Sequence, residues 1–167
     1  LFVCNHRSKF DPIISWYIFR KNHLAFISKP ENFNVPVFGR FIRKCCFMTI
    51  DRSDARSSLG TFTKAAELMK NDVVSVGVYP EGTRNRDGSL LPFHDGVFII
   101  ARKADVPIVV ATIDGTEKIT HNYPWKRTHI RLDIVGVIDR DFVNTHRTAA
   151  VGVAVREMME NNLKGTE

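Results

Sequence analysis

A histidine and an aspartate stand near the amino end of the chain, His6 and Asp11, with four residues between them. Two of the intervening residues are cations, Arg7 and Lys9, which would attract an anion to the same place. Imidazole titrates closest to neutrality among the side chains, so a histidine held by a carboxylate can remove a proton from a hydroxyl at physiological pH. In this arrangement Asp11 would hold one ring nitrogen of His6 and leave the other free to act as a general base.

Asp11 has a second interpretation, because it stands directly before Pro12 and an apolar run. Aspartate is a favoured helix N-cap and proline a favoured first helical residue. The two interpretations are compatible, since a carboxylate has two oxygens and each can serve a different partner.

A second group of polar residues, at positions 79–84, directly follows a Val-rich apolar run. Such a run is typical of a strand covered on both faces, and open α/β sheets bind ligands beyond the carboxyl ends of their strands. Gly82 permits close backbone approach, Thr83 offers a hydroxyl, and Arg84 offers a planar fork for two phosphate oxygens. The alternative is an ordinary surface turn in which Glu81 pairs with Arg84.

A third cation, Arg52, ends another expected strand and could reach the same crevice. Its alternative is an ion pair at the strand end with Asp51 or Asp54. If the strands before His6 and before position 79 run parallel in one sheet, their loops emerge at one edge and face one site.

Several catalytic signatures are missing from the sequence: Gly-x-Ser-x-Gly, Gly-x-x-x-x-Gly-Lys, His-Glu-x-x-His and Cys-x-x-Cys. Their absence weighs against a serine hydrolase, a nucleoside triphosphatase and a zinc enzyme. A base without an enzyme nucleophile remains, so the nucleophile would be the substrate's own hydroxyl. A phosphate held by arginines would set that hydroxyl beside the base.

The composition fits one domain, because 167 residues that are 44% hydrophobic can bury a sizeable core. Residues 1–52 carry nine Lys or Arg against three Asp or Glu, and the other 115 residues are balanced at 15 each. The whole net charge of +6 therefore lies in the part that holds His6 and Asp11. This excess favours an anionic substrate, an anionic membrane surface or nucleic acid, and its alternative is a solvated basic face.

The ends and the cysteines give weaker indications. No apolar stretch approaches the roughly 20 residues needed to cross a bilayer, and no signal-peptide pattern opens the chain. The chain begins at Leu1 without Met, in what reads as a strand already under way. We therefore expect one domain over residues 1–167 whose N-terminal membrane-anchoring segment is missing. Three cysteines without metal-ligand spacing fit a reducing compartment.

Strands that alternate with helices predict an α/β fold with a mostly parallel central sheet flanked by helices. The expected strands end near position 4 or span 24–28, 47–50, 73–79, 107–113 and 130–138. The expected helices span 12–22, 36–44, a long segment capped by Ser53, 97–104, and a last segment after Asn144. A loop runs from Pro80 to about Gly96 between them.

With these motifs the sequence resembles the glycerolipid acyltransferases, and the 1-acylglycerol-3-phosphate acyltransferases in particular. The family's Asn-His-x-x-x-x-Asp block stands intact as Asn5, His6 and Asp11. Its Phe-Pro-Glu-Gly-Thr-Arg block stands at residues 79–84, with Tyr in place of Phe.

Two further blocks of that family match in part, in the same order along the chain. Ile50 and Arg52 fit Phe-Ile-x-Arg, although Thr49 replaces the aromatic residue. Residues 106–109 fit Val-Pro-Ile-x-Pro up to the second Pro, which is Val110 here. The second block helps to bind the acceptor's phosphate in the family, so its departure bears on substrate choice.

The resemblance implies transfer of a fatty acyl group from acyl-CoA or acyl carrier protein to the free hydroxyl of 1-acylglycerol 3-phosphate, giving phosphatidic acid. His6 would be the general base and Asp11 its orienter, with no cofactor, no metal and no acyl-enzyme. Glycerol 3-phosphate and other lysophospholipids are alternative acceptors. The implied acceptor-binding residues are Arg52, Glu81, Gly82, Thr83, Arg84 and Lys29, with Arg7 a further candidate. Glu81 could instead shape its loop.

Members of that family commonly sit on membranes, so we expect membrane association at the cytoplasmic face. Aromatic residues mixed with cations are typical of interfacial segments, unless they belong to the core. The aromatic and apolar candidates are Trp16, Tyr17, Phe19, Phe38, Phe41 and Ile42. A non-catalytic module that binds anionic lipid is the rival interpretation, and no nucleic-acid partner is expected because no nucleic-acid motif is found.

Overall fold

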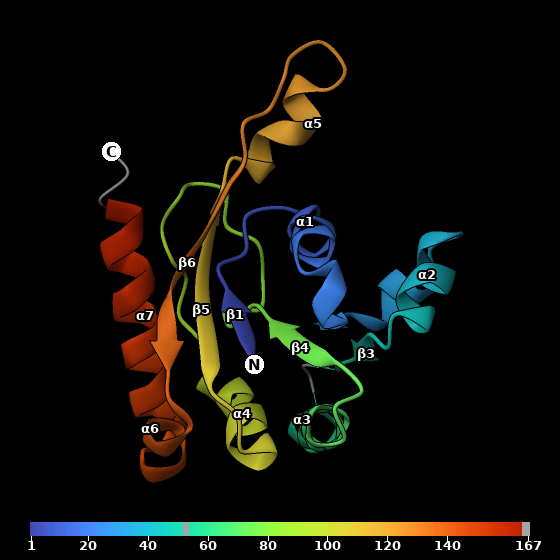
Figure 1. Ribbon diagram of the computed structural model, residues 1–167. Coiled ribbons are helices and arrows are strands. Elements are labelled where there is room, and N and C mark those ends of the chain that lie inside the picture. Colours follow the sequence, from blue (N-terminus) through green and yellow to red (C-terminus); the bar gives the residue numbers. More distant parts are fainter. Residues whose placement is uncertain (52–53, 165–167) are drawn as a thin grey trace.

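Six strands form a single sheet within residues 1–51 and 54–164, which the computed structural model describes (Figure 1). Their order is β3-β2-β4-β1-β5-β6. All neighbouring strands are parallel except β5 and β6, which are antiparallel, so the predicted α/β fold is confirmed. The strands are β1 (Phe2–Cys4), β2 (Leu24–Ser28), β3 (Met48–Thr49), β4 (Ser75–Val78), β5 (Ile108–Asp114) and β6 (Arg131–Ile138).

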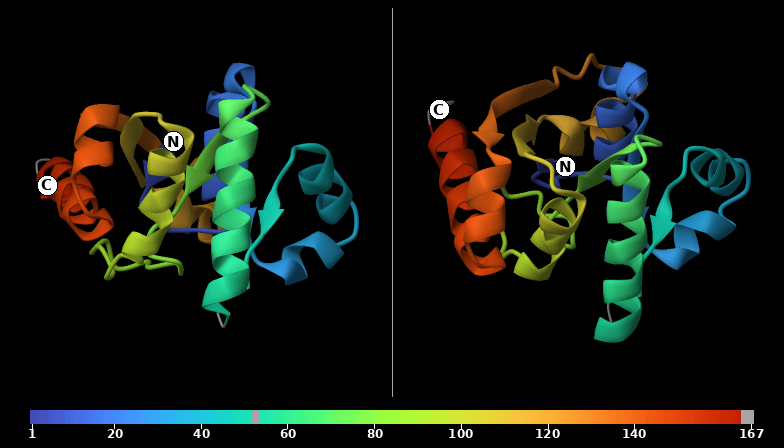
Figure 2. Two further views of the ribbon diagram at one scale, coloured as in Figure 1. Left: turned by 90° about the horizontal axis from the view of Figure 1, so that it is seen from below. Right: turned by 60° about the horizontal axis from the view of Figure 1, so that its bottom comes forward.

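Helices cover both faces of this sheet. Figure 2 shows α7, α4 and α3 side by side, and α1 packs from the opposite face. The α-helices in the described residues are α1 (Asp11–Ile18), α2 (Phe38–Lys44), α3 (Ala55–Lys70), α4 (Ile99–Ala104), α5 (Ile119–Asn122), α6 (Arg140–Thr145) and α7 (Thr148–Lys164). Short 3₁₀ turns lie at Arg20–Asn22, Pro30–Asn34, Asp95–Phe98 and Thr116–Lys118.

Two apolar clusters form the core, one on each face of the sheet. Val3 and Val110 are fully buried in the cluster with α3, α4 and α7, whereas Phe2 and Ile113 are buried in the cluster with α1. Successive side chains of a strand point to opposite faces, which explains this division. Because β1, β4 and β5 are covered on both sides, their sequences read as continuous apolar runs.

The carboxyl ends of the three central strands lie at one edge of the sheet. Phe2 of β1 pairs in parallel register with Gly77 of β4 and with Val109 of β5. The turn after β1, the loop after β4 and the connection after β5 therefore leave the sheet beside one another. The fold thus places the His6 turn and the loop at residues 79–84 at the same edge, as the sequence predicted.

Two of the predicted helix caps are wrong. Helix α3 has Asp54 as its N-cap, and the Asp54 carboxylate accepts a hydrogen bond from the backbone N–H of Arg56 at 2.9 Å. The predicted cap, Ser53, lies outside the described residues. In α1 the N-cap is Phe10, and Asp11 is the first helical residue. The Asp11 carboxylate makes no capping bond to α1, because its oxygens are used by the preceding turn.

Some helix boundaries also differ from the prediction. The predicted last helix is α7, and the short helix α6, which ends at Thr145 and was not predicted, precedes it. The first helix ends at Ile18 and continues only as the 3₁₀ turn Arg20–Asn22. The loop after β4 ends at Asp95, where a 3₁₀ turn leads into α4.

Candidate active site

The Asp11 carboxylate lies fully buried at the centre of the turn between β1 and α1. Its Oδ2 lies 2.7 Å from His6 Nδ1 and accepts the backbone N–H groups of Arg7 and Ser8 at 2.6 and 2.7 Å. Its Oδ1 accepts the Thr116 hydroxyl at 2.5 Å. These donors compensate the charge of a carboxylate that water cannot reach. A carboxylate can only accept, so the hydrogen of this contact belongs to His6 Nδ1, and a neutral imidazole held in this way presents the lone pair of Nε2.

The backbone of His6 is fixed from the neighbouring loop after β4. Its N–H donates to Glu81 Oε1 at 2.7 Å, and its C=O accepts the N–H of Asn85 at 2.8 Å. The other oxygen of Glu81, Oε2, accepts the N–H of Leu91 at 3.0 Å. Burial raises the pKa of Glu81, and the N–H groups of Leu91 and His6 oppose that rise. Each carboxylate oxygen of Glu81 accepts a backbone N–H group, so Glu81 links the His6 turn to the loop after β4.

The turn is also joined to β5 through the side chain of Asn5. Asn5 Nδ2 donates to the C=O of Ile113 at 3.0 Å, and Asn5 Oδ1 accepts the N–H of Ile113 at 2.7 Å. The amide thus reproduces a pair of sheet hydrogen bonds beyond the last residue of β1. Together with Thr116, this contact ties the His6 turn to the end of β5.

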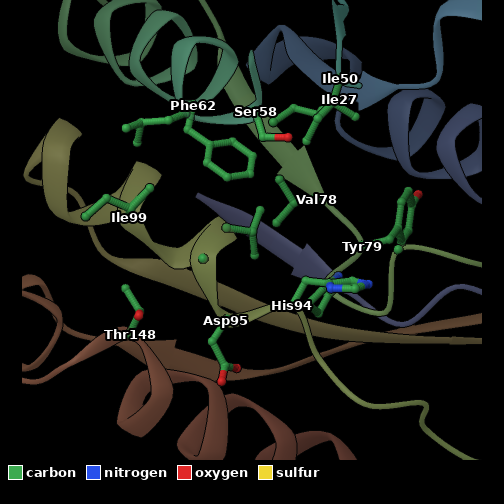
Figure 3. A pocket seen from close by; sticks show the side chains of 15 residues that line it. Ile27, Ile50, Ser58, Phe62, Val78, Tyr79, His94, Asp95, Ile99 and Thr148 are labelled. Atoms are coloured by element: carbon green, nitrogen blue, oxygen red, sulfur yellow. The ribbon is translucent and has the colours of Figure 1, made fainter. Parts of the chain in front are cut away.

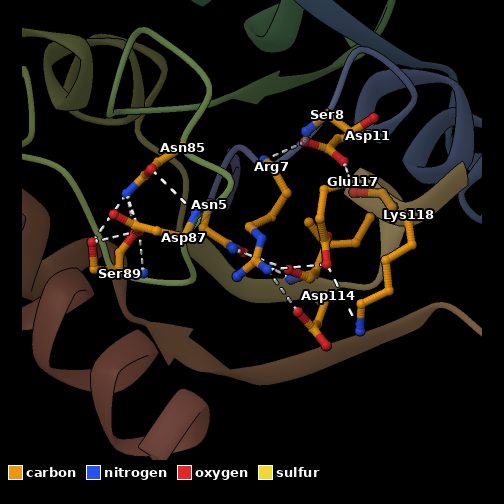
Figure 4. Close-up of polar contacts among 12 residues, drawn as sticks. Asn5, Arg7, Ser8, Asp11, Asn85, Asp87, Ser89, Asp114, Glu117 and Lys118 are labelled. Carbon is orange, nitrogen blue, oxygen red and sulfur yellow. Dashed lines mark hydrogen bonds and ion pairs between the residues drawn. The ribbon is translucent and has the colours of Figure 1, made fainter. Parts of the chain in front are cut away.

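Arg7 strengthens the same connection by charge. Figure 4 shows its side chain reaching between Asp114 and Glu117, and its Nη2 lies 3.2 Å from Asp114 Oδ1 and 3.2 Å from Glu117 Oε1. The side chains of Arg7 and Glu117 are both largely buried, so water screens this ion pair less than the pair with the half-exposed Asp114. In the same view Asn85, Asp87 and Ser89 close a separate turn by mutual hydrogen bonds.

Two aromatic rings, those of Tyr79 and Phe26, form a stack with the His6 ring. The His6 ring lies 4.3 Å from the Tyr79 ring at an interplanar angle of 17°, and Tyr79 lies 5.4 Å from Phe26 at 5°. Gly77 makes room for this stack, because a Cβ there would lie 2.4 Å from the Phe26 ring. Burial raises the pKa of Tyr79 well above its usual range, so its phenol stays neutral beside the imidazole.

His6 and Arg84 line one pocket of about 430 Å³, and with them lies much of the predicted phosphate-binding set. Gly82 and Thr83 line the same pocket, and so does Lys29 from the end of β2. Gly82 has a φ of 67°, a conformation that glycine adopts without strain. The pocket therefore unites an imidazole with cations and a hydroxyl, which is an arrangement suited to a small anionic substrate.

A second, more apolar pocket of about 730 Å³ adjoins the first, since Ile27, Tyr79 and Gly82 line both. Figure 3 shows its side chains converging from α3, β4 and the segment before α4. Its apolar lining residues include Ile27, Ile50, Leu59, Phe62, Val78, Val97 and Ile99. His94 and Asp95 also line this pocket, and the N–H of His94 donates to the C=O of Pro80 at 2.8 Å.

Some predicted site residues lie elsewhere. Arg7 lines neither pocket, because its guanidinium pairs with Asp114 and Glu117. Glu81 also lines neither pocket and is 3% exposed, since both its oxygens hold backbone, and this geometry fits the loop-shaping alternative. Arg52 lies outside the described residues. Within the described ranges, no group of His, Cys, Asp and Glu side chains could hold a metal ion.

Sequence reasoning missed three residues that organise the site. Thr116 lies 105 positions after Asp11, in a segment without a catalytic signature, and nothing local marked it as a partner. Asn85 binds His6 only through its backbone N–H, which leaves no trace in side-chain type. Gly77 could have been noticed as a glycine inside a Val-rich strand, which often marks a close approach of another group.

Comparison with known proteins gives a family and several relatives. Residues 1–114 match the family model described as Acyltransferase. The chain is 39% identical over 71% of its length to the chloroplastic 1-acyl-sn-glycerol-3-phosphate acyltransferase BAT2 of Brassica napus, of which this match covers 34%. It is 24% identical over 98% of its length to the 1-acyl-sn-glycerol-3-phosphate acyltransferase of Haemophilus influenzae, covering 68% of that protein.

A solved structure with a similar fold is also an acyltransferase. The crystal structure of the 1-acyl-sn-glycerophosphate (LPA) acyltransferase PlsC from Thermotoga maritima superposes with a TM-score of 0.75 at 28% identity. The match covers 98% of this chain and 64% of that chain. The chain spans between about a third and two fifths of the Brassica napus relative and the Cocos nucifera 1-acyl-sn-glycerol-3-phosphate acyltransferase.

Proposed function

This chain belongs to the acyltransferase family, and on that premise we propose that it transfers a fatty acyl group to the free hydroxyl of 1-acylglycerol 3-phosphate, giving phosphatidic acid. The names of its relatives support this acceptor. The observation that carries the proposal is the shared pocket of His6 and Arg84, with Asp11 buried behind the imidazole. The donor would be a thioester, acyl-CoA or acyl carrier protein.

The reaction needs one base, and His6 is the residue proposed for it. Nε2 of His6 removes the proton from the acceptor hydroxyl as the hydroxyl oxygen attacks the thioester carbonyl. The carbon–sulfur bond then breaks, and the leaving thiolate takes the proton from His6. Asp11 holds Nδ1 throughout and stabilises the imidazolium, so no acyl-enzyme and no cofactor are needed.

The acceptor's phosphate is proposed to bind to Arg84, Thr83 and Lys29, which are exposed and line the pocket. A guanidinium can bind two phosphate oxygens at once, which would orient the glycerol as well as attract it. Holding the phosphate would bring the free hydroxyl to the imidazole, and such positioning supplies a large part of the rate. Arg52, which lies outside the described residues, remains a proposed member of this set.

The apolar pocket is proposed to take the acyl chain of the donor. Its lining from Ile27, Phe62 and Val78 suits a hydrocarbon chain, because each buried methylene contributes about 0.8 kcal/mol. Tyr79 and Gly82 stand between this pocket and His6. The thioester carbonyl would therefore lie where the two pockets meet, close to Nε2.

The test is acyl transfer by the intact protein and by His6→Ala, with acyl-CoA and acyl carrier protein as donors. The acceptor panel is 1-acylglycerol 3-phosphate, glycerol 3-phosphate and lysophosphatidylcholine. His23→Asn is the matched control, because His23 is exposed, has a left-handed backbone that Asn tolerates, and lies at the amino end of β2. We expect turnover with 1-acylglycerol 3-phosphate to fall by about 10² to 10⁴ in His6→Ala only.

Three outcomes of this test would redirect the proposal. Equal product from the intact protein and His6→Ala would remove His6 as the base. Acceptor binding by calorimetry without any turnover in the intact protein would favour the non-catalytic lipid-binding module. A preference for glycerol 3-phosphate or for lysophosphatidylcholine would replace the proposed acceptor by one of the alternatives.

Membrane association at the cytoplasmic face is proposed on surface features. In the described residues no helix is both long enough and apolar enough to cross a bilayer. Tyr17 on α1 is 63% exposed, and Phe41 on α2 is exposed beside the exposed cations Arg40 and Arg43. Free cysteines suit a reducing compartment. Ile42 belongs to the core instead, which corrects its predicted interfacial role.

The interfacial proposal for α1 and α2 has its own test. Tyr17→Ser and Phe41→Ser should each weaken binding to phosphatidylglycerol vesicles in a sedimentation assay, because each removes exposed aromatic surface. Val153→Ser, at an exposed position of α7 that lines neither pocket, is the control. Unchanged vesicle binding in both variants would end the proposal for these helices without touching the acyl transfer.

A further inference from the structure

The connection between β5 and β6 forms an arm, defined here as residues 115–130. Figure 1 shows it standing clear of the other elements, beyond the carboxyl end of β5. That end of β5 is the edge at which His6 and the loop after β4 emerge. The arm therefore projects on the active-site side of the molecule.

The tip of the arm exposes two large aromatic side chains. Trp125 is 88% exposed and Tyr123 is 78% exposed, and Ile130 adds apolar surface nearer the base. By contrast, Trp16, the other tryptophan of the chain, packs edge-on against Phe41 with ring centroids 5.0 Å apart. A tryptophan left almost entirely in water gains much by burial against a partner.

The charge of the arm is one-sided. Residues 118–132 contain no Asp or Glu, while Lys126 and Arg127 directly follow Trp125. His121 and His129 flank the tip and are exposed. The arm's one acidic residue, Glu117, lies at the base and faces Arg7. Residues 53–167 as a whole balance their charges at 15 each, so the arm is a local basic segment in a neutral region.

The arm is closed and ordered by contacts of its own. The Asn122 C=O accepts the N–H of Lys126 at 2.7 Å, and Asn122 Nδ2 donates to Thr128 Oγ1 at 3.1 Å. At the base, Gly115 has a φ of 86°, and a Cβ there would lie 2.2 Å from the carbonyl oxygen of His129. The two limbs thus touch at Gly115, and the aromatic residues are presented on a fixed turn.

We propose that this arm docks on an anionic lipid surface, with Trp125 and Tyr123 entering the interface and Lys126 and Arg127 meeting the headgroups. Tryptophan and tyrosine are the residues that favour the boundary between hydrocarbon and headgroups. Adjacent cations add attraction to acidic lipids, and a basic aromatic tip has no acidic group that such a surface would repel. An acidic protein partner would complement the positive charge of the arm, but it would not account for the exposure of its two aromatic rings.

The inference deepens the proposed function, on which it rests for its biological meaning, because a lysophospholipid acceptor is reached at a membrane. The base of the arm touches the dyad through Thr116, whose hydroxyl binds Asp11. A surface held by the tip would therefore face the pocket of His6 and Arg84. The docking itself needs no turnover, so His6→Ala should bind vesicles as the intact protein does.

The test uses the chain with Trp16→Phe, so that Trp125 is its one tryptophan reporter. Vesicles of phosphatidylcholine with one-third phosphatidylglycerol should shift the emission of Trp125 to the blue and protect it from acrylamide. Vesicles of phosphatidylcholine alone should do so more weakly. Emission and quenching that do not change on either vesicle would overturn the proposal.

Variants then separate the rings from the charges. Trp125→Ala should lower partition to both vesicles by about tenfold, since the ring's burial is lost. The double change Lys126→Gln and Arg127→Gln should lower partition to anionic vesicles by roughly 30-fold and leave neutral vesicles unaffected. Val153→Ala and Arg147→Gln are the controls, because Val153 and Arg147 are exposed on or beside α7.

Binding of the arm to a different partner would give different results in these experiments. If Trp125→Ala removes a concentration-dependent dimer in sedimentation and leaves vesicle partition equal to that of Val153→Ala, the arm binds a second copy and the proposal is wrong. If only acyl carrier protein affinity falls, with partition unchanged, the arm is a donor surface and the proposal is equally wrong. Full vesicle binding without acyl transfer by the intact protein would contradict the proposed function and leave the arm's docking in place.

Discussion

The two halves of the candidate pocket are built in opposite ways. The turn that carries His6 and Asp11 is largely buried, and its Asp11 carboxylate and His6 backbone are hydrogen-bonded to Thr116, Glu81 and neighbouring backbone. The loop that carries Gly82–Arg84 has exposed side chains at Thr83 and Arg84. The first half is held in place by its own hydrogen bonds, whereas the side chains of the second half lie free in solvent.

This difference matches what each half is proposed to do. A base must hold its proton-accepting nitrogen in one position, and fixed partners remove the cost of reorganising it during the reaction. A headgroup receptor must admit and release a substrate, so exposed side chains suit it. Changes in the turn should therefore lower kcat, and changes in the loop should raise KM.

The largest effect is expected from Asp11→Asn. The amide cannot accept from Thr116, Arg7 N–H, Ser8 N–H and His6 together, so its NH₂ group will face at least one donor. His6 would lose the partner that selects its tautomer, and kcat should fall by about 10² to 10⁴. KM for 1-acylglycerol 3-phosphate should change little, and initial rates over a range of acceptor concentrations measure both.

The control for Asp11→Asn is Asp114→Asn, because Asp114 lies at the same edge and is paired with Arg7 without touching His6. It should retain nearly all of kcat. If Asp11→Asn instead raised KM strongly and left kcat intact, the turn would serve substrate binding. The proposed division of roles between the turn and the loop would then be wrong.

The sequence predicted the central elements of the fold because they carry their own patterns. The continuous apolar runs of β4 and β5 follow from their burial on both faces, and that burial is visible in residue type. Helix ends were less predictable. Helix α6 went unpredicted because six residues are too few to show a clear helical period, and the cap of α3 is Asp54, one residue after the predicted Ser53, which lies outside the described residues.

The residues of the candidate site were predictable where they lie in compact motifs. His6, Asp11, Gly82 and Arg84 fall within two short segments, and parallel strands bring those segments together. Thr116 was not predictable, because it meets Asp11 only through the pairing of β1 with β5. The role of Arg7 could not be predicted either, because the position of its side chain between two carboxylates depends on the fold.

Arg84→Gln tests the other half of the pocket, the loop with exposed side chains. Loss of the guanidinium removes charge-assisted hydrogen bonds to phosphate, so KM for 1-acylglycerol 3-phosphate should rise about tenfold to 100-fold, with kcat within a factor of about three. Arg86→Gln is the matched control, because Arg86 is exposed on the same loop but does not line the pocket. An equal rise in both variants would mean that general charge, and not position, attracts the acceptor.

Thr116→Val tests the hydrogen-bonded turn, and its effect on kcat should be smaller than that of Asp11→Asn. It replaces a hydroxyl that is fully buried and bonded to Asp11 Oδ1 by a methyl group of similar size. The carboxylate would lose one of its donors, and kcat should fall by roughly five- to tenfold with KM unchanged. Thr116→Ser keeps the hydroxyl and should restore most of kcat.

A merely destabilised protein could imitate this result, so a second variant is needed. Val155→Ala removes buried apolar atoms on α7, away from both pockets, and should lower the melting temperature at least as much as Thr116→Val. We expect Val155→Ala to keep its kcat at temperatures well below melting. If Val155→Ala and Thr116→Val lose kcat in parallel, Thr116 contributes stability alone and does not position Asp11.

The smallest effect is expected outside both halves, in the apolar pocket. Gly96 lines that pocket, and a Cβ there would meet no atom within 4 Å, so Gly96→Leu should fold and fill part of the space. Donors with long chains should lose rate by about fourfold, the effect of one methylene that no longer fits, while short-chain donors and the acceptor KM stay unchanged. Gly60→Leu, equally open but outside the pocket, is the control. A chain-length profile that stays the same in Gly96→Leu would separate this pocket from the donor and leave the turn and the loop as the whole of the site.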